Sequence, residues 1–160
     1  GYFKVEILKA NTPLYFDDKK KLMCISSAMS LIKLLTVEFQ KNINIFENIE
    51  IFFNELSSEQ WLKNYIFWEL NILKFLGYDL NLKNIVSSKN ENNQRKYIVK
   101  SSSVEKLVPN FLIEKNAEDT DYDTLLSGLK LVTDYLQKSI LIPNNISQPY
   151  PRVNFINILK

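Results

Sequence analysis

Glu69 is the residue of this sequence whose surroundings are most unusual for its type. It lies among large apolar side chains in the stretch WELNILKFLGY, residues 68–78. Burial raises the pKa of a carboxyl group, so a residue in this position is a candidate general acid. Two other interpretations stay open. Glu69 is either a structural anchor that accepts bonds from backbone N–H groups of a neighbouring helix end or turn, or a solvated residue at the edge of its helix.

The partners that a catalytic acid needs are missing from the sequence. The chain has no histidine and one cysteine, Cys24, so it cannot form a Ser-His-Asp or Cys-His catalytic group or a Cys/His zinc site within one subunit. It has three glycines and no G-x-G-x-x-G or P-loop motif, so a phosphate-binding loop is not expected. Asp121 and Asp123 flank an expected helix start, where carboxylates are stabilising in any case. We therefore predict no catalytic residue, no metal, no cofactor and no enzymatic activity.

Basic residues are spread along the chain, whose formal net charge is only +2. This balance excludes a strongly basic nucleic-acid module but allows a local basic patch. The candidates for contact with DNA are Lys19, Lys20, Lys21, Arg95, Lys96 and Arg152. An ordinary solvated surface has the same composition, so that interpretation remains beside the DNA-binding one.

The apolar periodicity predicts a mostly α-helical fold, a helical bundle around a central apolar helix at residues 59–76. Ser57 or Ser58 is expected to cap this helix, and Gly77 to end it in a left-handed conformation. Four further helices are expected, at about 17–40 with Asp17 or Asp18 as cap, 44–56 with Asn44 as cap, 121–142, and 151–159.

Between the central helix and the next one, the sequence predicts a small irregular insertion with some β structure, at about residues 80–115. Residues 87–96 are polar without periodicity and are expected to form a loop, and residues 97–99 a short strand. Residues 104–113 are expected to be partly extended, with a break at Pro109. At the other end of the chain, residues 2–8 alternate as a strand does. The sequence contains no apolar run long enough for a transmembrane helix.

The order of these features resembles the C-terminal part of the RecO recombination mediator family. The most specific part is WELNILKFLGYDLNL, residues 68–82, which is similar to the family's aromatic-Glu-Leu and Leu-Gly-Tyr motif. GYFKVEIL at the start resembles the last strand of the family's N-terminal OB domain, and the tail PYPRVNFINIL matches its final helix. The resemblance implies that residues 1–10 are the remnant of an OB domain that is mostly missing, and that residues 11–160 form the helical domain.

The resemblance also implies a cytoplasmic DNA repair and recombination mediator without enzymatic activity. Such a protein binds single- and double-stranded DNA, anneals strands, and helps to load the recombinase with RecR. It also binds the acidic-hydrophobic tail of single-strand-binding protein, for which Tyr65, Phe67 and Trp68 are the candidate groove residues.

This sequence departs from the family's pattern at two places. Cysteines that bind zinc in some relatives are absent after the Gly-Tyr turn, so no zinc is expected. Ile66 and Phe67 stand where some relatives carry the Arg that would grip a carboxylate terminus. The alternative from another class is a generic helical protein–protein interaction domain without a DNA role.

Overall fold

The computed structural model describes residues 10–37, 41–91, 94–101, 104–114 and 120–160. The chain forms two compact units. One unit combines the segment up to Thr36 with Pro149–Lys160, and the other consists of Val37–Gln148. The mostly helical fold with a small β element is confirmed. The strand predicted at residues 2–8 lies outside the described residues. No helix in the described ranges has the length and hydropathy to cross a bilayer.

The smaller unit contains η1 (Thr12–Tyr15), α1 (Lys19–Leu35) and α6 (Tyr150–Leu159). Asp18 caps α1 as predicted, because its Oδ1 accepts the backbone N–H of Lys21 at 3.0 Å. Helices α1 and α6 pack against each other. The prediction that the first helix reaches residue 40 is wrong: it ends at Leu35, and Thr36 takes an extended conformation.

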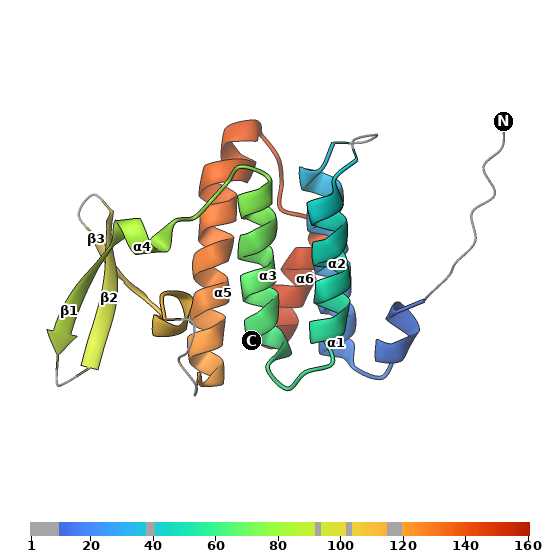
Figure 1. Cartoon of the computed structure of the whole chain (residues 1–160), viewed down its shortest axis with the longest axis horizontal. Helices are drawn as coiled ribbons and strands as arrows, with labels where there is room; N and C mark the ends of the chain where they lie inside the picture. Colours follow the sequence, from blue (N-terminus) through green and yellow to red (C-terminus); the bar gives the residue numbers. More distant parts are fainter. Residues whose placement is uncertain (1–9, 38–40, 92–93, 102–103, 115–119) are drawn as a thin grey trace. The chain divides into compact units, whose positions relative to one another are not determined.

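The larger unit is built around α3 (Trp61–Phe75), which contacts both α2 (Ile43–Glu55) and α5 (Tyr122–Leu136). Figure 1 shows α3 between the other two helices, so the prediction of a central helix is confirmed. Helix α5 begins after Asp121, whose carboxylate accepts bonds from the backbone N–H and the hydroxyl of Thr124. These bonds stabilise the ionised form and lower the pKa of Asp121. The chain continues past α5 through η3 (Gln137–Leu141) and η4 (Ile142–Asn144).

Two predicted helix caps are wrong. The side chain that caps α2 belongs to Asn42, not Asn44, and accepts the N–H of Ile45 at 3.2 Å. Neither Ser57 nor Ser58 caps α3, because Gln60 occupies the N-cap position without a side-chain bond. Several polar residues precede each helix here, and sequence spacing alone does not select among them.

The end of α3 is a Schellman motif. Gly77 has φ = 87°, its N–H donates to the carbonyl of Lys74, and the N–H of Tyr78 donates to the carbonyl of Leu73 at 2.8 Å. This left-handed turn stops the helix where the sequence predicted and directs residues 78–82 back along the unit.

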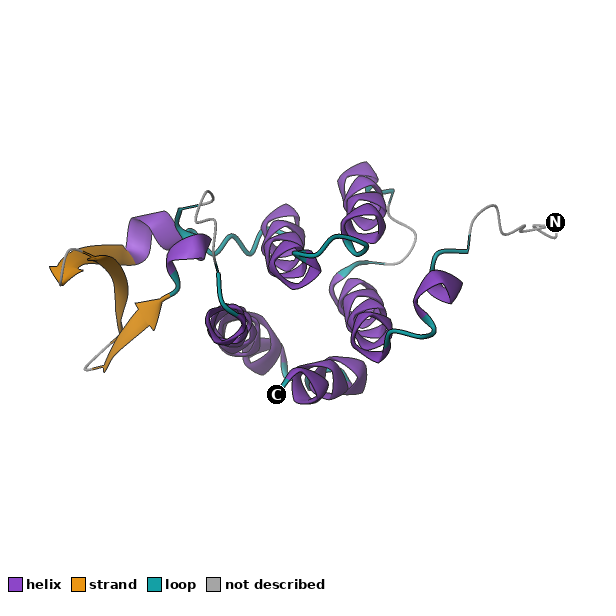
Figure 2. Cartoon of the chain, turned by 90° about the horizontal axis from the view of Figure 1, so that it is seen from below, coloured by secondary structure: helices purple, strands orange, loops and turns teal. Residues whose placement is uncertain are grey.

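The expected irregular insertion is a three-stranded antiparallel sheet in the order β1 (Val86–Glu91), β2 (Gln94–Ser101), β3 (Val104–Val108). A short helix, α4 (Leu82–Ile85), leads into it. The prediction of a loop at residues 87–96 is therefore wrong, because β1 extends to Glu91 and β2 begins at Gln94. Ser88 lies opposite Tyr97, and Val108 lies opposite Tyr97 on the other side. In both Figure 1 and Figure 2 the sheet lies at the side of this unit away from α2.

The short helix η2 (Asn110–Leu112) joins the sheet to the helices. Phe111 is buried, its ring lies edge-on to Phe67 of α3 at 5.9 Å between centroids, and it packs on Gly128 of α5. A Cβ at Gly128 would lie 2.5 Å from Cζ of Phe111, so the absence of a side chain there is what allows this approach.

We expect Gly77→Ala to destabilise the protein by about 1 kcal/mol. The space around Gly77 is open, so the cost comes from the left-handed backbone and not from a clash. Urea unfolding measures the change. Gly77→Asn is the matched variant and should lose less, since Asn tolerates this conformation better. Equal stability of Gly77→Ala and the parent protein would contradict the role given to this turn.

Candidate functional site

A groove of about 560 Å³ runs along the exposed side of α2 and α3 in the larger unit. Its volume lies within the range of small-ligand and peptide pockets. The turn after Gly77 and the start of α4 contribute residues 79–83 to its lining, so the Schellman motif determines part of its wall. Its apolar lining consists of Ile51, Phe67, Trp68, Leu70, Leu80, Leu82 and Leu112.

Trp68 fixes the two helices that form the groove. Its indole Nε1–H donates to the backbone carbonyl of Asn48 on α2 at 2.8 Å, across 20 positions of sequence. The ring of Phe52 lies 4.9 Å from that of Trp68, and the ring of Tyr65 is stacked 5.7 Å from it. Aromatic packing and a satisfied indole N–H together fix the spacing of α2 and α3.

Both positively and negatively charged residues line the groove: three lysines and two acidic residues. The lysines are Lys63, Lys74 and Lys83, and the acids are Glu55 and Asp79. Lys74 and Asp79 lie 4.0 Å apart and are both exposed, so this ion pair contributes little to stability. Lys63 differs from the other lysines because only 8% of its surface is exposed. A positive charge in a desolvated position attracts an anion more strongly than one in water.

Of the three candidate groove residues, two line the groove and one does not. Phe67 and Trp68 line the groove. Tyr65 does not, because it is 1% exposed and lies in the aromatic cluster under the groove. Sequence analysis missed Lys63 and Lys74, although Lys63 stands one helical turn before Phe67 and Lys74 one turn after Leu70.

Glu69 is 1% exposed, so the interpretation as a solvated edge residue is wrong. It does not line the groove. Among the described residues there is no group of three or more His, Cys, Asp or Glu side chains arranged to hold a metal ion. The interpretation of Glu69 as an anchor remains a prediction, consistent with the need of a buried carboxylate for polar partners.

The basic candidates occupy different environments. Lys19 and Lys20 are exposed at the start of α1, and Nζ of Lys21 lies 5.8 Å from the ring centroid of Tyr15. Arg152, in contrast, is fully buried. This burial contradicts a direct contact with DNA, because a buried guanidinium does not reach a phosphate.

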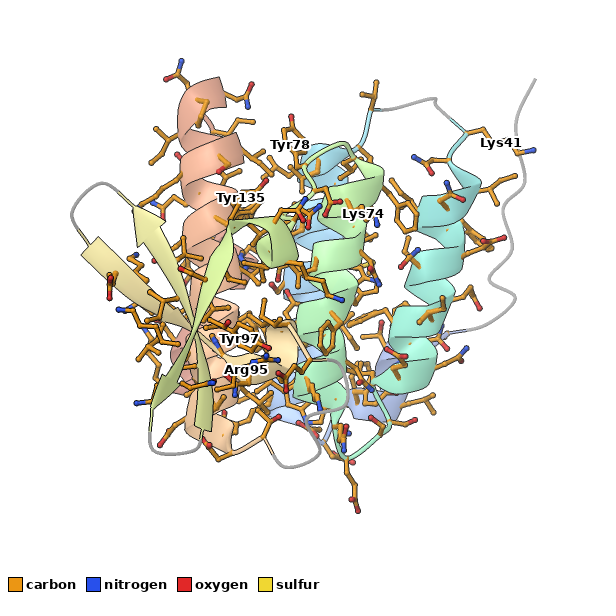
Figure 3. The ribbon with its side chains drawn as sticks, turned by 60° about the vertical axis from the view of Figure 1, so that its left-hand side comes forward. Lys41, Lys74, Tyr78, Arg95, Tyr97 and Tyr135 are labelled. Atoms are coloured by element: carbon orange, nitrogen blue, oxygen red, sulfur yellow. The ribbon has the colours of Figure 1, made fainter. Side chains whose placement is uncertain are left out.

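Arg95 and Tyr97 lie on the part of β2 that faces η2, where Figure 3 shows them close together. The backbone carbonyl of Arg95 accepts a bond from the side chain of Asn110 at 2.9 Å. The hydroxyl of Tyr97 donates to Glu114 at 2.5 Å, and this bond, together with burial, raises the pKa of Tyr97. Burial and the charge of Asp79 likewise raise the pKa of Tyr135 on α5. The bonds from Asn110 to Arg95 and from Tyr97 to Glu114 attach the sheet to the segment around η2. Lys96 is half-buried on the other face of β2.

The larger unit thus combines a helical core, a groove along α2 and α3, and an attached three-stranded sheet. Comparison with known proteins identifies its family: residues 17–139 match the family described as "Recombination protein O C terminal". The chain therefore belongs to the RecO family.

Curated relatives named "DNA repair protein RecO" support this assignment. The chain is 30% identical to the protein of Rickettsia akari, with 99% of this chain and 71% of that protein aligned. It is 22% identical to the protein of Rhodospirillum centenum over 98% of this chain and 68% of that protein. With the protein of Rickettsia canadensis it shares 34% identity over 51% of this chain and 34% of that protein. No solved structure matches the chain.

We expect Glu69→Ala to lower the free energy of unfolding by about 1–3 kcal/mol, since polar partners of a buried carboxylate would be left unsatisfied. Thermal unfolding measures the loss. Glu50→Ala is the matched control, because Glu50 is an exposed helical glutamate and its loss should change stability by less than about 0.5 kcal/mol. DNA annealing at a permissive temperature should survive in Glu69→Ala. Loss of annealing in a variant that remains fully folded would contradict the anchor role.

Proposed function

We propose that the chain is the C-terminal helical part of a DNA repair and recombination mediator that acts by binding and not by catalysis. The observation that carries this proposal is the RecO family match over residues 17–139, together with a groove that has an apolar lining and lysines at its edges. The protein binds single- and double-stranded DNA in the cytoplasm, anneals complementary strands, and assists recombinase loading together with RecR.

The groove between α2 and α3 binds the acidic-hydrophobic tail of single-strand-binding protein. Phe67, Trp68 and Leu70 offer apolar contacts for the hydrophobic residues of the tail. The three lysines of the groove face the acidic residues of the tail. The groove is therefore complementary to the tail in both hydrophobicity and charge.

Lys63 takes the role that Arg has in some relatives. The Arg positions are occupied here by Ile66 and Phe67, but Lys63 lies on the same face of α3 as Phe67, one turn earlier. Its low exposure makes an ion pair with a carboxylate stronger than one at Lys83, which is exposed. Lys binds as a single point charge and not through the bidentate geometry of Arg.

DNA contacts come from cations that are exposed or half-buried, with Lys19, Lys20 and Lys21 in the smaller unit and Arg95 and Lys96 in the larger one. Such contacts act through phosphates, so affinity falls as salt rises.

Removal of the Lys63 charge should weaken tail binding. We expect Lys63→Gln to lower the affinity for a labelled peptide of the tail by about tenfold, and Lys63→Arg to retain most of it. Fluorescence anisotropy measures both. Lys138→Gln is the matched control, since Lys138 is exposed and lies outside the groove. An unchanged affinity in Lys63→Gln would exclude Lys63 as the anchor, and no binding of the peptide to the parent protein would exclude the groove assignment.

The full-length protein should anneal complementary strands without nucleotide. The measurement is the rate of duplex formation from two labelled oligonucleotides, compared with protein-free DNA, at two salt concentrations. Acceleration that decreases with salt supports the mediator function. A rate equal to that of free DNA would favour the alternative, a helical interaction domain without a DNA role.

A further inference from the structure

The outer face of the three-stranded sheet carries a hollow that the groove does not include. Side chains from all three strands line this hollow of about 240 Å³, namely Lys89, Lys96, Ile98, Glu105 and Leu107. Alternation along the strands directs Tyr97 and Val108 to the other face, where both are buried. The hollow is therefore on the face opposite to the one that attaches the sheet to η2.

Two like charges lie directly opposite each other in this hollow. Lys89 of β1 is paired in register with Lys96 of β2. Directly opposed like charges on one face of an antiparallel pair are destabilising. An anion that binds between the two lysines therefore reduces their repulsion. By sequence, residues 86–108 contain five basic and two acidic residues, a net charge of +3, whereas the whole chain has +2. The excess positive charge of the chain is thus concentrated in the sheet.

Glu105 supplies the negative charge of this hollow. Its carboxylate lies 3.1 Å from Nζ of Lys89, and the ion pair spans β2 from β1 to β3. Ile98 lies on β2 between them and is only 8% exposed although it belongs to the open face. Both members of the ion pair are about half exposed, so the pair is weak and can be displaced.

We propose that this face binds the phosphodiester backbone of single-stranded nucleic acid, and that the backbone displaces Glu105 from Lys89. The proposal rests on the DNA-binding function proposed above, to which it adds a site and an internal competitor. Leu107 is 65% exposed beside the lysines and offers an apolar surface for bases. Only a single strand presents its bases in this way, because in a duplex the base faces are stacked inside.

The lysine pair is tested with Lys89→Gln/Lys96→Gln in the full-length protein. Binding of labelled oligothymidylate, measured by anisotropy, should weaken on the order of tenfold at low salt. The slope of log affinity against log salt should become less steep by about 1.4, the value for two lost phosphate contacts on a single strand. Lys130→Gln/Lys138→Gln is the matched control, since both residues are exposed in the same unit outside the sheet. Equal losses in the two double variants would overturn the site.

The competitor is tested with Glu105→Gln, which should raise the affinity for the same oligonucleotide roughly two- to fivefold. Asp134→Asn is the matched control, because it makes the same charge change. Asp134 also pairs with a sheet lysine, Lys106, at 3.3 Å, but on the face of the sheet opposite to the hollow. A gain in Asp134→Asn as large as in Glu105→Gln would show a general charge effect and overturn the competition.

One comparison separates this inference from the proposed function, and a competition experiment tests the class of the partner. If the parent protein anneals strands and both sheet tests fail, only the sheet inference falls; if it binds no oligonucleotide, both fall. Polyglutamate that competes for the sheet as well as oligothymidylate does, at equal charge, would replace nucleic acid with an acidic protein partner and overturn the assignment.

Discussion

Helix α3 is apolar around most of its circumference, and the larger unit is organised by the need to cover it. Helix α2 covers one side, where the indole of Trp68 bonds to the carbonyl of Asn48. Helix α5 covers another, and η2 places Phe111 against Phe67 and Gly128. Coverage by separate elements leaves a groove where α2 and the turn after Gly77 do not meet. The groove is thus a consequence of how a buried helix is enclosed.

Phe67 links the two surfaces to which we assign partners. One part of its side chain lines the groove, and its ring contacts Phe111, which continues into the sheet through Pro109 and β3. The aromatic contact between Phe67 and Phe111 holds the groove between α2 and α3 and the three-stranded sheet in one unit. We infer that a protein tail and a nucleic-acid strand can be bound at the same time, because the two proposed surfaces are built from different residues.

The sequence predicted the features that depend on strong local signals. The end of α3 followed from Gly77, the start of α5 from Asp121, and the central position of α3 from its apolar circumference. The hairpin at residues 86–101 was missed because its strands carry polar residues on both faces and lack a regular alternation. The roles that we propose for Lys63 and Glu105 also require the fold, since each depends on neighbours from other elements.

The central claim is that the groove between α2 and α3 receives a partner's acidic-hydrophobic tail. The chain contains two tryptophans, Trp61 and Trp68, of which only Trp68 lines the groove. The most direct measurement is a titration of the protein with the tail peptide, followed through the two indole N–H signals by NMR. We predict that the Trp68 signal shifts in a saturable way while the Trp61 signal stays in place. Saturable binding that leaves the Trp68 signal unchanged would contradict the account.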